Sequence, residues 1–239
     1  MQPFIGRIGG KTRLANRIVA MIPKHKTYVE PFIGGGSVFL RKPPSEKEYI
    51  NDLDKDISDL WKDIKKFGSK IPGFKFSGSK KQFNSFKTQK KMKASAERLF
   101  RNLYLSRYSY GSNRVVYAHR AAPKNIKKNA VKYQERLKDV TITRKDWKKL
   151  LKHDSKDTFW YLDPPYETGS TDKWGYKPFT ATELLPVLKK IKGSFILSFE
   201  YSAANAKIFK PFKVKKVSTT YNIAPGEVQK KVELLVYNF

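Results

Sequence analysis

The chain has 239 residues and is strongly basic, with 50 Lys and Arg against 21 Asp and Glu and a formal net charge of +29. It contains no cysteine, which excludes disulfides, zinc–thiolate sites and thiol nucleophiles. Hydrophobic residues make up 39% of the chain, enough to form the core of one large α/β domain or of one domain that carries an insertion.

The positive charge attracts polyanions, and nucleic acid is the usual partner of such a field. The N-terminus lacks the charged-then-apolar layout of a signal peptide, and no apolar run approaches the roughly 18 residues that span a bilayer. We therefore expect a soluble protein without membrane contact. It is expected inside the cell, in the cytoplasm or nucleoid, or in the host cell if the source is viral.

The first predicted element is a helix over residues 11–22, where apolar residues recur at helical spacing. A short apolar strand at 27–32 follows and leads into three consecutive glycines at 34–36. The segment 37–42 is expected to open a second helix. A second strand at 48–52 ends in acidic residues.

The excess charge is concentrated between Trp61 and Lys138, a stretch with 22 Lys and Arg and only three acids. Aromatic residues are interleaved with these charges, so the stretch can supply contacts to phosphates and to bases. Within it, residues 94–108 predict a helix and residues 111–125 a loop or hairpin. The flanking regions are more balanced in charge, which suggests a basic module inserted into an α/β fold.

Five strands are predicted after the basic module, with a helix between the second and the third. This helix begins at Thr180, which forms a capping box with Glu183, although Pro186 restricts the course of the helix. The predicted strands are residues 140–143, 158–162, 194–199, 214–223 and 232–239. Strands that alternate with helices indicate a largely parallel sheet with ligands at the carboxyl ends of the strands, here closed by an antiparallel hairpin.

The glycine turn lets the backbone bend tightly and lets a ligand approach closely. Its spacing is not G-x-G-x-x-G, and the Gly-Lys-Thr at 10–12 lacks the upstream glycine of a phosphate-binding loop. Asp52 follows about 20 residues later at the end of the next strand, where an acid typically accepts hydrogen bonds from ribose hydroxyls. This pattern fits an adenosine-like nucleoside, and a plain strand–turn–helix without a ligand is the alternative.

The sequence Asp163-Pro164-Pro165-Tyr166 follows the apolar strand 158–162. Proline has no N–H, so the two prolines offer only carbonyl oxygens beside the Asp163 carboxylate. Such a cluster of acceptors suits an amino group with two hydrogens to donate. Tyr166 supplies a ring that can stack on a base flipped out of a duplex. The alternative is a polyproline turn with no chemical role.

Together with the segments "EPFIGGGS", "NDLD" and "PFIGRIGGKTRL", the "DPPY" motif resembles the Dam-like (D12 class, α-group) DNA adenine-N6 methyltransferases. The motifs occur in the family's order and cover nearly the whole chain. The resemblance implies a Rossmann-like class I methyltransferase sheet with S-adenosylmethionine as methyl donor and no metal. It divides the chain into a catalytic domain (1–56 and 139–239) and an inserted DNA-recognition domain (57–138).

The resemblance also implies roles for individual residues. Direct methyl transfer to the N6 amine of a flipped adenine would be catalysed by Asp163, Pro164, Pro165 and Tyr166. The cofactor would be bound by Arg7, Gly10, Lys11, Glu30, Pro31, Phe32, Gly34, Asp52, Asp146, Trp147 and Asp163. Double-stranded DNA would be the partner, bound by a monomer or by a dimer on DNA.

The chain departs from the family pattern at two places. Arg7 stands where the family usually has an aromatic residue, and Ser106 replaces an Asn in the insert. Recognition of a particular DNA sequence is therefore not carried over. Because Arg reads guanine and Asn reads adenine edges, basic and amide residues of the insert are the DNA-binding candidates. They are Arg107, Asn113, Arg114, Arg120 and Lys124, and solvated loop residues are the alternative.

Three other functions stay open at this point. Cytosine-N4 methylation usually has Ser in place of Asp163, so the acid favours adenine. RNA is compatible with the charge. A DNA-binding protein on a decayed methyltransferase scaffold is supported only by Arg7. Restriction protection, viral self-marking and replication control all use the same chemistry, so the biological role is not indicated.

Overall fold

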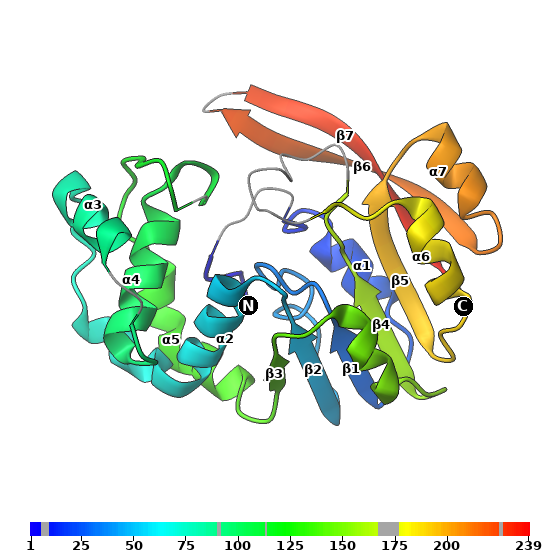
Figure 1. Ribbon diagram of the computed structural model, residues 1–239, viewed down its shortest axis with the longest axis horizontal. Coiled ribbons are helices and arrows are strands. Elements are labelled where there is room, and N and C mark those ends of the chain that lie inside the picture. The colour runs from blue at the N-terminus through cyan, green and yellow to red at the C-terminus, as the bar shows by residue number, and fades with distance from the viewer. Residues whose placement is uncertain (6–9, 90–91, 113, 167–176, 225–226) are drawn as a thin grey trace.

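The computed structural model describes residues 1–5, 10–89, 92–112, 114–166, 177–224 and 227–239. Its centre is a seven-stranded sheet in the order β3-β2-β1-β4-β5-β7-β6 (Figure 1). The strands are β1 Thr27–Glu30, β2 Lys47–Asn51, β3 Thr141–Thr143, β4 Thr158–Leu162, β5 Ser194–Glu200, β6 Lys213–Ala224 and β7 Glu227–Tyr237. The first five are parallel, whereas β7 runs antiparallel to both β5 and β6.

Helices cover the sheet and extend to one side of it. The α-helices are α1 Ala15–Met21, α2 Lys55–Phe67, α3 Lys80–Thr88, α4 Ala96–Arg107, α5 Lys124–Arg136, α6 Ala181–Leu188 and α7 Ala203–Ile208. Short 3-10 helices are η1 Gly68–Gly73, η2 Tyr110–Ser112 and η3 Trp147–His153. This arrangement confirms the predicted mostly parallel α/β sheet with an antiparallel C-terminal hairpin.

The chain between β2 and β3 forms the helical group α2 to α5, which lies beyond the β3 edge of the sheet in Figure 1. Inside the group, Arg98 of α4 donates hydrogen bonds of 2.7 and 2.6 Å to the buried Asp63 carboxylate of α2. Arg136 at the end of α5 pairs with Glu48 of β2. The division into two domains stays a prediction, because buried residues of the sheet and of the helical group share one continuous core.

The two faces of the sheet are buried in different ways. One face packs against α1 and the helical group, and the other packs against α6, α7 and η3. All five residues of β4 are buried, as a central parallel strand covered on both faces should be. The capping box of Thr180 and Glu183 is present at the start of α6, as predicted, and Pro186 lies inside that helix.

The prediction of a helix at 37–42 is wrong. Residues 37–41 form consecutive turns, with hydrogen bonds from Leu40 N to Gly36 O and from Arg41 N to Val38 O. Pro43 and Pro44 follow at once, and a residue before proline is disfavoured in the helical region. The segment is therefore too short to nucleate a stable helix. No helix among the described residues is both long and apolar enough to cross a membrane.

The C-terminal hairpin is longer than predicted. Residues 233–237 of β7 pair with β5, and the pairing ends where Glu233 lies opposite Glu200. The pairing of β6 with β7 continues beyond this point, from Ser218 opposite Val232 onward. The hairpin therefore extends past the carboxyl end of β5, over the edge where the parallel strands end (Figure 1).

Candidate active site at the carboxyl edge of the sheet

Asp163 stands directly after the buried strand β4. Its side chain is 19% exposed, and its Oδ1 lies 2.8 Å from the Nζ of Lys11, which is buried in the N-terminal segment. Burial raises the pKa of the Asp163 carboxyl to about 6, although the Lys11 ammonium acts in the opposite direction. The structure therefore brings together Asp163, the predicted catalytic residue, and Lys11, a predicted cofactor-binding residue. The two motifs that carry them lie far apart in the sequence.

A second carboxylate, Glu233 of β7, lies behind this pair. Its side chain is 2% exposed, and its Oε1 lies 3.7 Å from Lys11 Nζ. The Tyr166 hydroxyl donates a hydrogen bond of 3.4 Å to the same oxygen, and Lys11 Nζ lies 5.6 Å from the centroid of the Tyr166 ring. Sequence reasoning missed Glu233. The only sequence signal for it was the presence of an acid within the apolar run of the last strand.

The two prolines differ in their surroundings. Pro164 is buried, whereas the carbonyl oxygen of Pro165 accepts a hydrogen bond of 2.8 Å from Phe179 N. Tyr166 and Phe179 also form an isolated parallel β-bridge. The Pro165 carbonyl is therefore occupied by the chain itself, which leaves the Asp163 carboxylate and the Pro164 carbonyl as the acceptors expected to face a ligand.

Glu30 ends β1, the strand beside β4. Its carboxylate is buried and accepts a 2.6 Å hydrogen bond from the hydroxyl of Tyr28. Burial, together with the nearby Asp163 charge, raises the pKa of Glu30 to about 8. Glu30 is therefore protonated at neutral pH and adds little negative charge to the site.

The glycine turn and Asp52 meet at this edge of the sheet. Asp52 Oδ2 accepts a 2.9 Å hydrogen bond from Gly34 N, and its Oδ1 accepts one of 3.0 Å from Asp54 N. Trp61 of α2 donates from Nε1 to Gly34 O at 2.9 Å and closes the turn from the other side. Gly34 and Gly36 have φ of 45° and 67°, a conformation that glycine adopts without steric cost.

Asn51 joins three segments at this edge. Its side-chain amide donates to Pro31 O and to Lys145 O, both at 3.0 Å, while its oxygen accepts from Lys145 N and from the Thr143 hydroxyl. Asn51 is 1% exposed, so these buried polar groups are all satisfied. The ends of β1, β2 and β3 are thereby held together on the side where Asp52 lies.

Phe32, Trp147 and Phe179 form an aromatic cluster beside these strand ends. The ring centroid of Phe32 lies 5.7 Å from that of Trp147 and 5.4 Å from that of Phe179. The indole of Trp147 is 5% exposed, and its Nε1 has no hydrogen-bond partner among the described residues. An aromatic cluster with one buried donor, close to the strand end that carries Asp52, could accommodate an adenosine-containing cofactor.

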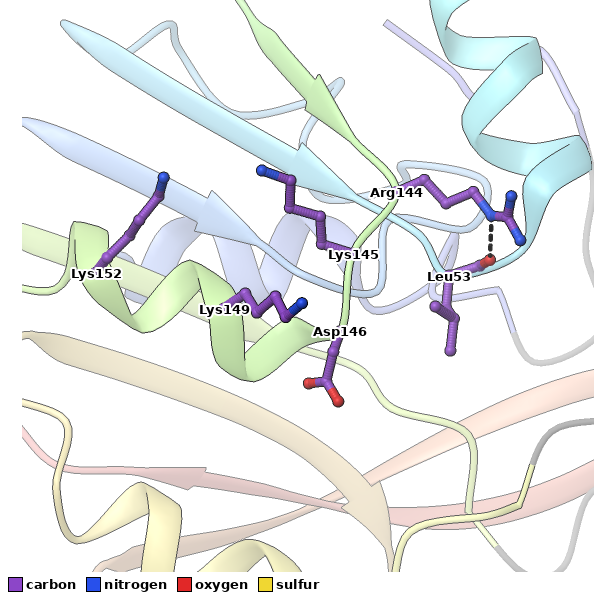
Figure 2. Close-up of a pocket in the computed structure, with 6 residues that line it drawn as sticks. All are labelled: Leu53, Arg144, Lys145, Asp146, Lys149 and Lys152. Atoms are coloured by element: carbon purple, nitrogen blue, oxygen red, sulfur yellow. Dashed lines mark hydrogen bonds between the residues drawn. The ribbon is translucent and has the colours of Figure 1, made fainter.

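Asp146, which precedes Trp147 in the chain, is one of the residues that line a pocket of about 610 Å³ (Figure 2). Four cations and Leu53 complete the lining, and Arg144 Nε donates to Leu53 O at 3.1 Å. The pocket is lined by Leu53, Arg144, Lys145, Asp146, Lys149 and Lys152. Asp146 itself begins η3 by accepting a hydrogen bond from Lys148 N, so only part of its acceptor capacity faces the pocket.

The predicted DNA-binding residues are only partly placed. Arg107 donates two hydrogen bonds to Ala121 O, and Arg114 bonds to Ser106 Oγ and pairs with Asp56 at 3.2 Å. Arg120 is exposed. Arg7, Asn113 and the side chain of Lys124 lie outside the described residues. The loop after α4 also exposes Tyr110, one of the interleaved aromatic residues, and the side chains of Val115 and Val116, which sequence reasoning missed.

The parallel sheet, the glycine turn tied to an acid at the next strand end, and Asp-Pro-Pro-Tyr after β4 define the class I methyltransferase type of site. A sequence model of the D12 class N6 adenine-specific DNA methyltransferases matches residues 8–223. The chain therefore belongs to this family, as the sequence predicted. This family is described as adenine-specific, which supports adenine over cytosine as the target base.

Several characterised proteins are similar over full length. The Type II methyltransferase M1.LlaDCHI of Lactococcus lactis subsp. cremoris is 25% identical over 100% of this chain and 96% of its own. The Type II methyltransferase M.MjaIII of Methanocaldococcus jannaschii is 24% identical over 100% and 99%. Among solved structures, the precorrin-6Y C5,15-methyltransferase of Geobacter metallireducens GS-15 is 9% identical, covers 100% of this chain and 99% of its own, and has a TM-score of 0.45.

Proposed function

We propose that this chain transfers a methyl group from S-adenosylmethionine to the N6 amine of an adenine flipped out of double-stranded DNA. The observation that carries the proposal is the position of Asp163. It is a partly exposed carboxylate at the carboxyl end of a fully buried strand, next to the edge where Asp52 and the glycine turn meet. We further propose that the chain is the modification enzyme of a restriction–modification pair, as the names of its relatives suggest.

The aromatic cluster and Asp52 would hold the cofactor. In this assignment Asp52 accepts from the ribose, Trp147 Nε1 donates to the adenine, and Phe32 lines the pocket. When bound, S-adenosylmethionine supplies an electrophilic methyl group on a sulfonium sulfur. Among the described residues no group of His, Cys, Asp and Glu is arranged to hold a metal ion.

Asp163 and the Pro164 carbonyl would each accept one N–H of the target amine. An exocyclic amine is a poor nucleophile, because its lone pair is delocalised into the ring. Two acceptors that hold the two hydrogens pyramidalise the nitrogen and expose the lone pair. S-adenosylmethionine would supply the methyl group and keep the C–S electron pair on its sulfur, and the Asp163 carboxylate would take the proton that the amine loses. Positioning of two bound reactants supplies most of the rate.

The helical group and its loop would hold the DNA. Between Trp61 and Lys138 the chain carries 22 Lys and Arg against three acids, so the surface is suited to phosphates. The exposed Tyr110, Val115 and Val116 would contact bases, since apolar side chains can touch the thymine methyl group or an unstacked base. Residues 57–138 are thus proposed as the DNA-recognition domain.

Transfer of a labelled methyl group to duplex DNA tests the proposal. We expect label on adenine N6, and we expect Asp163→Asn to lower the single-turnover rate by at least about 100-fold with duplex affinity within a few-fold of wild type. Affinity for duplex should also fall steeply with rising salt, because bound cations release counterions from many phosphates. Tight DNA binding by a wild-type protein that binds no cofactor would instead support a decayed scaffold.

A further inference from the structure

The Lys11 ammonium lies between two carboxylates of different exposure. Asp163, which is 19% exposed, is 2.8 Å away, and Glu233, which is 2% exposed, is 3.7 Å away. The Lys11 side chain is itself 3% exposed. The buried Lys11 ammonium is therefore shared by the partly exposed Asp163, which is proposed to contact the substrate, and the fully buried Glu233.

While Lys11 holds Asp163, it makes the carboxylate a weaker acceptor for the target amine. An ammonium has three donors and no acceptor, so while it holds Asp163 Oδ1 it competes with the donors of the target amine. Removal of a buried cation from its partner leaves an uncompensated charge, which is strongly unfavourable. Glu233 offers a second partner within a short movement of the same side chain, so Lys11 can leave Asp163 without losing its ion pair.

We propose that Glu233 is a positioning residue that takes over Lys11 when the target amine reaches Asp163. Its hydrogen bond from the Tyr166 hydroxyl would at the same time fix the ring expected to stack on the base. This inference rests on the proposed function, because it needs a substrate that donates to Asp163. It assigns a role to β7, a strand in which sequence reasoning singled out no site residue.

The electrostatics of the site agree with this role. Glu233 is among the groups that raise the pKa of Asp163, whereas Lys11 lowers it. The other titratable groups that interact with Asp163 are Glu30 and the phenols of Tyr161 and Tyr166. Loss of the Glu233 charge should therefore bind Lys11 more firmly to Asp163 and lower the pKa of Asp163.

Glu233→Gln keeps the size of the side chain and an acceptor for Tyr166 but removes the charge. In single-turnover assays with saturating cofactor and duplex, we expect its plateau rate to fall by about tenfold to 100-fold. We expect duplex affinity to stay within about twofold of wild type, and the acid limb of the pH–rate profile to move to lower pH. A wild-type rate together with an unmoved acid limb would overturn the proposal.

Two matched variants separate charge from packing. Glu233→Asp keeps the charge and shortens the chain by one methylene, so it should keep the wild-type acid limb and lose less rate than Glu233→Gln. An equal loss in both variants would show a packing effect and would overturn the proposal. Asp157→Asn removes an exposed carboxylate at the opposite end of β4 and should leave both the rate and the profile unchanged.

A structure of the wild-type protein with a cofactor analogue and a duplex tests the inference without any variant. Lys11 Nζ should then lie nearer to Glu233 than to Asp163. If Lys11 still holds Asp163 in that ternary complex, the proposed exchange is wrong. Failure of the wild-type protein to methylate adenine would instead reject the proposed function, so the two failures are distinguishable.

Discussion

Lys11 Nζ lies 2.8 Å from Asp163 Oδ1, although 151 residues lie between the two in the sequence. The contact joins the N-terminal Gly-Lys-Thr element to the Asp-Pro-Pro-Tyr element at one strand end. It also explains why Asp163 can be buried and still ionise, since an isolated carboxylate in the same surroundings would have a still higher pKa. The two motifs therefore act as one site.

The rate of methyl transfer should depend on the ionisation of Asp163. Burial raises the pKa of this carboxyl to about 6, and only the carboxylate form can take the proton that the target amine loses. We expect the single-turnover rate to be about tenfold lower at pH 5 than at pH 7, following the carboxylate fraction. A flat rate between pH 5 and pH 7, measured with a duplex that stays annealed, would contradict this assignment.

Asp52 should matter for the cofactor more than for the fold. Its two oxygens already accept from Gly34 N and Asp54 N, and the proposed ribose contact would add to these bonds. Asp52→Asn should weaken cofactor binding by about tenfold to 100-fold, since charge-assisted hydrogen bonds are lost. Isothermal titration with the cofactor measures the effect, and unchanged affinity would place the ribose elsewhere. Asp157→Asn is the surface control.

Local patterns predicted the strands and the helices α1, α4 and α6 well, whereas α3, α5 and α7 were not predicted. The sequence "TFWYL" corresponds to β4 at both ends, and Thr180 caps α6. In these segments apolar periodicity and capping chemistry agree with the tertiary environment. The helix prediction at 37–42 failed because the three consecutive apolar residues Val38, Phe39 and Leu40 fit a helix or a buried turn equally well. Only Pro43 and Pro44 indicated the turn.

The candidate site was predictable where motifs carried it. The pairing of Asp52 with the glycine turn follows from the order of the parallel strands, and the Asp-Pro-Pro-Tyr motif made Asp163 the expected catalytic residue. Glu233 could not be found in this way, because its position depends on the register of two antiparallel strands. The internal pairing of Arg114 with Asp56 likewise depends on how the helical group packs.

Glu30 should make the protein less stable as pH rises. Its pKa is about 8 in the folded state and 4.5 without burial, so the folded protein holds a proton that the unfolded chain releases between these values. The stabilisation from this proton is complete below pH 4.5 and is lost as pH rises through 8, at roughly 1.4 kcal/mol per unit of pKa shift. Glu30→Gln keeps an acceptor for Tyr28 and cannot ionise.

Urea unfolding at pH 5, 6.5 and 8 tests this linkage. The wild-type free energy of unfolding should fall with pH more steeply than that of Glu30→Gln, and the difference between the two proteins should grow toward pH 8. Parallel slopes for the two proteins would show that Glu30 is ionised in the folded state at pH 5. All other titrating groups are shared, so they cancel in the comparison.

Gly36 should tolerate no side chain. Its φ is 67°, and a Cβ added there would lie 2.5 Å from the Trp61 ring, whose own Nε1 holds Gly34 O. Because overpacking and a left-handed backbone both cost energy, Gly36→Ala should lower the free energy of unfolding by about 2–4 kcal/mol and weaken cofactor binding.

Gly73→Ala is the matched control, since nothing lies within 4 Å of its added Cβ. It should be neutral or stabilising by up to about 1 kcal/mol. Equal stability of the two variants in urea unfolding would mean that the glycine turn and α2 are not packed together as described.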